Sequence, residues 1–111
     1  MSEIEDSLSA IKKIEGVDSI ILVEKVGLAA ESFLPKDKDT AEISAMAASL
    51  WGLGEFFIKR LGSGKLECIS VESKRSKILT FPFEGKVLVI STKKDVATEE
   101  LNKKLASLLS V

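Results

Sequence analysis

The chain has 111 residues, the length of one ordinary domain, and we expect a single domain over residues 1–111. Hydrophobic residues make up 45% and charged residues 30%, which is typical of a globular protein rather than a disordered one. The 16 Lys and Arg residues nearly balance the 17 Asp and Glu residues, which argues against a nucleic-acid partner. Because the chain contains no histidine, Ser-His-Asp triads and most zinc sites are excluded.

Three features bear on the compartment of the protein. The first residues are acidic, where a secretory leader would be basic and then apolar. The longest uncharged run, residues 43–54, is too short to span a bilayer. Cys68 is the single cysteine, so no disulfide forms within the chain. We therefore expect a cytoplasmic protein that does not insert into a membrane.

The first elements in chain order are a helix and a hairpin. Ser2 and Glu5 form a capping box, and apolar residues follow at helical spacing: Ile4, Leu8, Ile11 and Ile14. Gly16 ends this helix. Residues 17–24 contain a continuous aliphatic run, which indicates a strand covered on both faces. A turn at Gly27 and a returning strand over residues 28–33 complete the hairpin.

The longest predicted element is a helix over residues 39–61, which an Asp-type capping box begins and Gly62-Ser63-Gly64 ends. Three strands follow, over residues 65–73, 76–84 and 87–90. A last helix begins at Thr98. Pro82 indicates a strand end, an edge or a bulge. The element order is α-β-β-α-β-β-β-α, and the short turns make the strands largely antiparallel, which defines an α+β domain. The first and fifth strands, both fully apolar, are expected near the sheet centre.

The long helix has two faces to bury. The face predicted to pack on the sheet contains Ile43, Met46, Ala47, Leu50, Gly54, Phe57, Ile58 and Leu61. The opposite face contains Ala45, Ala48, Ser49, Gly52, Glu55, Phe56 and Lys59. Small residues on this second face allow another helix to approach closely, by analogy with membrane helices. We predict that a second copy packs there in a symmetric dimer; the alternative is a solvated, Ala-rich surface.

Other motifs are better explained structurally. Residues 62–65, Gly-Ser-Gly-Lys, resemble the end of a P-loop, but Lys59 and Leu66 stand where that pattern requires glycine and a hydroxyl residue. No nucleotide, metal, cofactor or catalytic site is therefore predicted. Cys68 is expected to be a small core residue. The basic cluster at residues 74–77 is either a solvated turn or a surface for an acidic partner.

Several segments together resemble one known family. Residues 16–23, Gly-Val-Asp-Ser-Ile-Ile-Leu-Val, and then 27–30, Gly-Leu-Ala-Ala, resemble the opening hairpin of the roadblock (dynein light chain roadblock-type) family. The Ala-rich helix from residue 42 to residue 54 resembles its long second helix. Residues 79–82, Leu-Thr-Phe-Pro, and then 87–90, Val-Leu-Val-Ile, resemble its last hairpin. The resemblance covers nearly the whole chain.

The resemblance implies a five-stranded antiparallel sheet with the long helix on one face and the terminal helices on the other. It implies dimerisation through the long helix and through edge pairing of the third strand, which adds Glu67, Ile69 and Val71 to the interface. Family members regulate or anchor small Ras-like GTPases. A homodimeric, non-enzymatic scaffold or regulator of such a GTPase is therefore the predicted function.

The sequence also offers residues for contact with that partner: Glu55, Lys59, Arg60 and Arg75. The two arginines are the candidates for an arginine finger, but the sequence assigns that role to neither. Two alternatives to GTPase binding stay open. A small-molecule sensor would contain a ligand cavity, and a purely structural adaptor module would only join parts of a larger complex.

Overall fold

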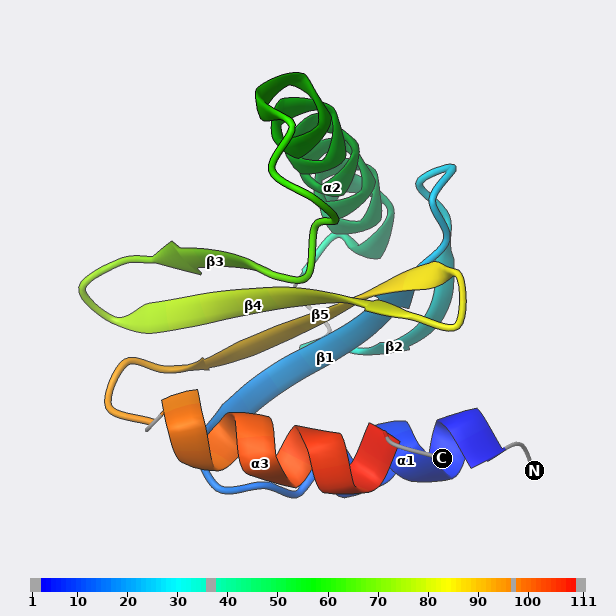
Figure 1. Ribbon diagram of the computed structural model, residues 1–111. Coiled ribbons are helices and arrows are strands. Elements are labelled where there is room, and N and C mark those ends of the chain that lie inside the picture. Colours follow the sequence, from blue (N-terminus) through cyan, green and yellow to red (C-terminus); the bar gives the residue numbers. More distant parts are fainter. Residues whose placement is uncertain (1–2, 36–37, 97, 110–111) are drawn as a thin grey trace.

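The computed structural model describes residues 3–35, 38–96 and 98–109 (Figure 1). Within them the elements follow the predicted order: α1 (Glu3–Lys12), β1 (Val17–Val23), β2 (Ala29–Phe33), α2 (Thr40–Leu61), β3 (Ile69–Glu72), β4 (Ser76–Phe83), β5 (Lys86–Lys93) and α3 (Thr98–Leu109). The Ser2 cap predicted for α1 lies outside the described residues. The α+β class is confirmed.

The five strands form one antiparallel sheet in the order β2-β1-β5-β4-β3. The two strands that contain the continuous apolar runs, β1 and β5, are neighbours inside the sheet, as predicted, and β2 and β3 are its edges. Helix α2 covers one face of the sheet, and α1 and α3 lie side by side on the other (Figure 1). The layers implied by the resemblance are therefore confirmed.

Alternation along β1 and β5 divides the core between the two faces of the sheet. The cluster on the α1 and α3 face contains Leu8, Ile11, Val17, Ile20, Leu22, Leu79, Leu88, Ile90, Leu101 and Leu105. The cluster beneath α2 contains Ile21, Val23, Ala47, Trp51, Val87 and Val89. Burial of each large side chain contributes about 1.5–3 kcal/mol. The continuous apolar runs predicted strands covered on both faces, and the two clusters confirm this.

The ends of α2 follow the predicted chemistry. The Asp39 carboxylate accepts a hydrogen bond from the Glu42 backbone N–H at 3.0 Å, which satisfies a donor of the first turn. Gly62 adopts a left-handed conformation with φ 63°, and its N–H bonds to carbonyls of the last turn. Both ends are therefore specified by local residues.

The β4–β5 hairpin explains Pro82. Its turn residues Glu84 and Gly85 have φ of 50° and 75°, the left-handed geometry of a two-residue hairpin turn. β3 pairs with β4 only from Lys77 to Thr80, so Pro82 lies beyond its reach. Because no strand needs a donor there, the missing N–H costs no ladder bond.

Two predictions about the segment before β4 are wrong. The strand expected over residues 65–73 is only Ile69–Glu72, because residues 62–68 carry the chain from the end of α2 to the sheet edge. Leu66 packs against the cluster beneath α2 on this path. Cys68 is an exposed residue at the edge rather than a core residue.

Candidate protein-interaction surface

A single stripe of α2 is buried against the sheet, and it consists of Ser44, Ala47 and Trp51. These residues are three and four positions apart, so they lie on one side of the helix. Trp51 is only 2% exposed and packs in the cluster beneath α2. It is the widest side chain of this stripe, and its position determines which way α2 faces the sheet.

The prediction of which α2 residues face the sheet is therefore wrong for three large residues. Met46, Phe57 and Leu61 are 63%, 64% and 67% exposed. Ile43, Leu50 and Ile58 are only half-buried. The apolar side of the helix is wider than one contact with a sheet can cover, and the stripe centred on Trp51 leaves one flank uncovered.

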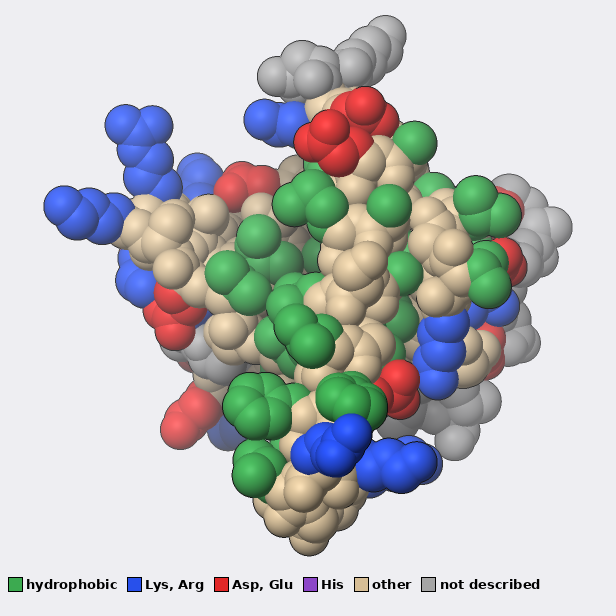
Figure 2. All heavy atoms as spheres, turned by 90° about the horizontal axis from the view of Figure 1, so that it is seen from above, with side chains coloured by type: hydrophobic (Ala, Val, Ile, Leu, Met, Phe, Trp, Pro, Cys, Tyr) green, Lys and Arg blue, Asp and Glu red, His purple; other side chains and the backbone are tan. Residues whose placement is uncertain are grey.

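The uncovered flank forms an apolar stripe made of Met46, Leu53, Phe57 and Leu61. Their spacings of seven, four and four residues place them on one side of the helix. Leu53 is 64% exposed, and the neighbouring Phe56 is 54% exposed. Figure 2, which looks down on α2, shows hydrophobic side chains along the helix and over the sheet beside it. Such contiguous exposure on a protein surface marks an interaction site.

A groove of 1020 Å³ lies between α2 and the sheet. Its helical wall contains Ile43, Met46 and Leu50. Its sheet wall is formed by Ser19, Ile21, Val71, Ser76, Ile78, Thr80, Val89 and Ser91. A smaller hollow of 480 Å³ follows along α2 and is lined by Leu53, Phe56, Phe57 and Arg60. The groove and the apolar stripe share Met46, so they form one surface.

The outer edge of β3 adjoins this groove. Among the described strands β3 pairs with β4 alone, so its other side is an open edge, which we call the β3 edge. Val71 is 42% exposed and lines the groove, whereas Ile69 packs under α2. Open edges are sites for pairing with another strand. We refer to the apolar stripe, the groove and the β3 edge together as the association surface.

The predicted dimer-interface residues of α2 have different surroundings. Ala45 and Ser49 line the groove, and Gly52 and Phe56 are exposed. Ala48 is half-buried and packs against the cluster beneath α2. Part of the predicted interface thus meets the association surface, while Ala48 is engaged inside the protomer.

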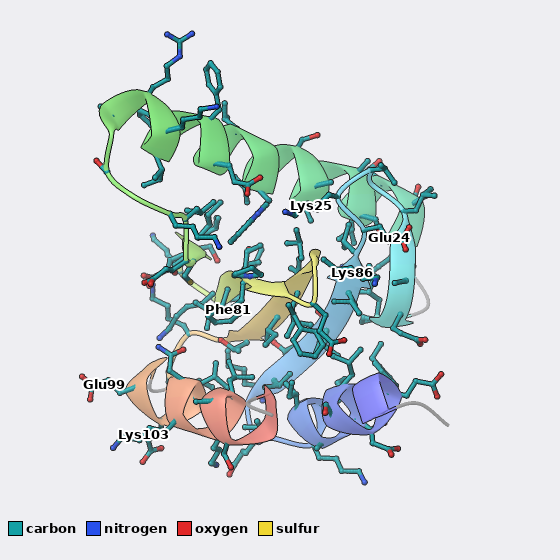
Figure 3. The ribbon with its side chains drawn as sticks, turned by 45° about the vertical axis from the view of Figure 1, so that its right-hand side comes forward. Glu24, Lys25, Phe81, Lys86, Glu99 and Lys103 are labelled. Carbon is teal, nitrogen blue, oxygen red and sulfur yellow. The ribbon has the colours of Figure 1, made fainter. Side chains whose placement is uncertain are left out.

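The hairpin between β1 and β2 shields the other flank of α2. Lys25 at its tip lies close to α2 (Figure 3), and its Nζ is 3.9 Å from the Glu55 carboxylate. A Cβ added to Gly27 would lie 3.6 Å from the Cα of Ala45. Glu55, one of the predicted partner-binding residues, is therefore engaged with the protein's own hairpin.

The other predicted partner-binding residues lie in two places. Lys59 and Arg60 are in the last turn of α2, and the Arg60 guanidinium lies 4.9 Å from the centre of the Phe56 ring. Such cation–π contact at an exposed site contributes about 0.5–1 kcal/mol. Arg75 lies in the turn between β3 and β4, on a different part of the fold. The structure thus does not bring these cations into one cluster.

Three buried polar atoms lie in the layer between α2 and the sheet. The Ser44 and Thr80 hydroxyls and the Trp51 indole N–H have no hydrogen-bond partner among the residues that the structure describes. Ser44 is fully buried, and Thr80 on the groove wall is 1% exposed. An unpaired buried polar group costs about 1–3 kcal/mol. These atoms destabilise the contact between α2 and the sheet, and the sequence pattern did not single them out.

The described residues offer few other features that could bind a ligand or react. Partial covering of the Cys68 thiol raises its pKa above the ordinary value of 9.0, although the residue as a whole is exposed. The described residues contain no cluster of three or more His, Cys, Asp or Glu side chains that could hold a metal ion. In the same part of the chain, no helix is both long enough and apolar enough to cross a membrane.

Comparison with known proteins places the chain in a family. Residues 3–92 match the Roadblock/LC7 domain, and the chain belongs to this family, as the sequence resemblance predicted. Two uncharacterised proteins of Methanocaldococcus jannaschii are each 32% identical over 85 residues, which cover 77% of this chain and 75% of theirs.

Solved structures agree with this fold. MglB of Myxococcus xanthus has a TM-score of 0.89 at 14% identity, covering 97% of this chain and 89% of its own. A Roadblock/LC7 domain from Streptomyces avermitilis has a TM-score of 0.84 at 19% identity, covering 97% of this chain and 92% of its own. Another solved structure is described as MglB with a tetrameric arrangement. At these identities the likeness concerns the fold alone.

Proposed function

We propose that this chain is a non-enzymatic, cytoplasmic homodimeric scaffold that binds a small Ras-like GTPase through its roadblock fold. The observation that carries the proposal is the association surface. Its exposed stripe, groove and open strand edge are contiguous, so one partner can cover all three. A second copy of the chain supplies a matching helix and a matching strand edge in a symmetric contact.

The energetics support association. Four large apolar side chains of the apolar stripe, Met46, Leu53, Phe57 and Leu61, are more than 60% exposed in the isolated protomer. Burying such groups on both copies contributes roughly 8–16 kcal/mol, at about 1–2 kcal/mol for each partly exposed side chain. The loss of freedom on association costs an estimated ~4–15 kcal/mol. The β3 edge adds backbone hydrogen bonds, so a stable dimer is the expected state.

The groove is the place for the partner's helix. Its walls are mainly apolar, and it lies beside the apolar stripe that a partner helix would contact. Val71 belongs both to the β3 edge and to the groove wall. Edge pairing and helix packing can therefore form around the same two-fold axis. Phe56, Glu67 and Ile69, which the sequence also assigned to the interface, lie next to this surface.

The GTPase partner is supported by membership of the roadblock family. The exposed end of α2 offers a contact site for it, because Lys59 and Arg60 lie together in the last turn and the Arg60 guanidinium packs on the exposed Phe56 ring. This combination suits a partner surface that has acidic groups around an apolar anchor. We assign the role of an arginine finger to neither Arg60 nor Arg75.

The experiment uses purified Ras-like GTPases encoded by the same genome, each loaded with GDP or with a non-hydrolysable GTP analogue. Calorimetric titration should detect binding to one GTPase in one nucleotide state. The double variant Lys59→Glu with Arg60→Glu should weaken that binding without changing the mass of the dimer. Absence of nucleotide-dependent binding to every such GTPase would refute the proposed partner.

A second candidate function is small-molecule sensing. The specific observation is the groove itself, whose wall carries the buried Thr80 hydroxyl, for which the described residues supply no hydrogen-bond partner. A ligand in the groove would compete with the partner's helix. Metabolites that raise the unfolding temperature of the monomeric variant Phe57→Glu, and that dissociate the wild-type dimer, would favour this function over the scaffold.

A further inference from the structure

We propose that one end of the sheet, where the β3–β4 turn meets the connection from β5 to α3, adsorbs to an anionic lipid bilayer through Lys74, Arg75 and Lys93. We call this end the basic corner, and it consists of residues 72–77 and 93–95. The contact is with the layer of lipid headgroups, and no part of the chain enters the hydrocarbon. This inference goes beyond the proposed function and depends neither on the GTPase nor on the dimer.

Hydrogen bonds join the two segments of the basic corner. The Lys94 N–H donates to the Arg75 carbonyl at 3.1 Å, and Lys77 Nζ donates to the Val96 carbonyl at 2.8 Å. Within the turn, the Ser73 hydroxyl oxygen accepts from the Arg75 N–H at 3.2 Å. The cations of two segments that are separate in the sequence are therefore held together at one end of the sheet.

Positive charge is concentrated in the basic corner. Five of the 16 Lys and Arg residues of the chain lie there, but only two of the 17 Asp and Glu residues, Glu72 and Asp95. The rest of the chain is therefore net acidic. Figure 2 shows Lys and Arg side chains that extend from the left side of the molecule, where the β3–β4 turn lies in Figure 1.

Only part of this positive charge is neutralised within the protomer. Lys94 forms an ion pair with the Glu72 carboxylate. The hydrogen bond and charge of Lys94, together with the charge of Lys77, hold the pKa of Glu72 below its ordinary value of 4.5, so both cations lie near this carboxylate. Three other cations are exposed and have no side-chain ion pair or hydrogen bond within the described residues: Lys74, Arg75 and Lys93.

The side chains of the basic corner favour lipid headgroups over a protein partner. Protein interfaces are centred on apolar or aromatic anchors that exclude water. Within the described chain, no exposed large hydrophobic residue belongs to the basic corner, and Val71, which precedes it, lines the groove. Anionic headgroups attract Lys and Arg without such an anchor, and each cation strengthens binding roughly fivefold. The three free cations should therefore strengthen adsorption roughly a hundredfold over that to neutral lipid.

The rest of the molecule allows this contact. Glu99 lies on α3, in the layer on the other side of the sheet from α2 (Figure 3). The longest axis of the molecule measures 37 Å, whereas charge interactions in 0.1 M salt fade over about 10 Å. The association surface contains none of the three free cations, so self-association and adsorption use different side chains.

Co-sedimentation of the full chain with vesicles tests the proposal. The vesicles contain phosphatidylcholine alone or phosphatidylcholine with phosphatidylserine, at equal total lipid. The chain should bind the anionic vesicles at low salt, and 1 M salt should abolish binding because the screening length falls to about 3 Å. K74E/R75E should lower the partition coefficient at least roughly thirtyfold, and K93E at least roughly fivefold. Failure of the wild type to bind anionic vesicles at low salt would overturn the proposal.

Two matched variants control for net charge and for folding. K25E/K86E makes the same change in net charge at the other end of the sheet, since Lys86 begins the strand that Lys93 ends, and it should bind as the wild type does. K74R/R75K keeps both charges in the basic corner and should also bind normally. Equal loss of binding in K74E/R75E and K25E/K86E would show a general effect of charge and would overturn the assigned site.

The same variants distinguish the bilayer from other anionic partners. Each chain is also titrated with a short DNA duplex at the same salt concentration. Binding to the duplex that K74E/R75E weakens, together with no binding to anionic vesicles, would overturn the bilayer in favour of a nucleic acid. Dimerisation and GTPase binding are measured separately without lipid, so their failure would leave the expected vesicle binding unchanged.

Discussion

Two glycines in α2, two residues apart, are expected to respond to the same substitution in opposite ways. A Cβ at Gly54 would lie 2.7 Å from Ile69 Cδ1 and 3.0 Å from Leu66 Cδ2, both closer than ordinary contact. A Cβ at Gly52 would have no such neighbour within 4 Å among the described residues. Gly54 therefore allows the chain after α2 to pack against the helix, whereas nothing within the described protomer requires a glycine at position 52.

The magnitudes follow from two opposing terms. Alanine in a helix interior is favoured over glycine by about 1 kcal/mol. Overpacking costs about 1–3 kcal/mol, and the clashing atoms at Gly54 are ends of side chains that can shift. Gly54→Ala should therefore lose about 1 kcal/mol of stability, while Gly52→Ala should gain about 1 kcal/mol. The melting temperatures should differ by roughly 8–16 °C, at 4–8 °C per kcal/mol for a chain of this size.

Urea unfolding at one protein concentration measures both effects. Both substitutions are made in the Phe57→Glu background, which is expected to be monomeric, because dimerisation makes stability depend on concentration. Gly52→Ala is the matched control for helix propensity. If Gly54→Ala is as stable as Gly52→Ala, the packing of Leu66 and Ile69 against α2 does not require a glycine, and the argument is refuted.

Three further substitutions test separate parts of the fold. Thr80→Val should raise the free energy of unfolding by about 1 kcal/mol, because it removes an unpaired buried hydroxyl at nearly constant shape; a loss in urea unfolding would show that the hydroxyl is satisfied. Asp39→Ala should lower stability by about 1 kcal/mol through loss of the α2 cap, and an unchanged midpoint would contradict this. The hydrogen bond and charge of Lys94 hold the pKa of Glu72 below its ordinary value of 4.5, so the stability from this pair is present above pH 4.5 and is lost as pH falls through the lowered pKa. Glu72→Gln should therefore melt below wild type at pH 6 and equal to it at pH 2, and a constant difference would refute the assignment.

The order of elements was predictable because each depends on local signals. Continuous aliphatic runs predicted the two central strands, and the cap at Asp39 and the turn at Gly62 predicted the ends of α2. The limits of β3 were not predictable. Residues 65–68 have strand-like composition, but the distance from the end of α2 to the sheet edge requires them to run as a connection.

The orientation of α2 depended on packing that the sequence pattern does not contain. A wheel of apolar positions cannot distinguish a core contact from an interface, since both exclude charge. The pattern placed Met46, Phe57 and Leu61 in the core, whereas Trp51 occupies the contact together with the small residues Ser44 and Ala47. The signal that was available was the width of the apolar side, which exceeds one buried stripe.

The sequence predicted the type of candidate site, a protein-interaction surface, but only some of the residues that form it. The sequence indicated that α2 carries a second apolar face, and the family resemblance implied that the third strand forms an edge; the structure leaves Phe56 and Val71 exposed at these two places. Leu53 was not singled out because it belonged to neither predicted face. The groove was also not anticipated, because it depends on how much of the sheet α2 leaves uncovered.

Sedimentation velocity over a wide range of concentrations tests the central claim most directly. The claim is that the association surface joins two copies, so the wild type should sediment with twice the 12.0 kDa mass of one chain. Phe57→Glu should sediment as a folded monomer, whereas Lys103→Glu on α3 should remain a dimer. A wild-type chain that sediments at the mass of one chain at every concentration would contradict the account.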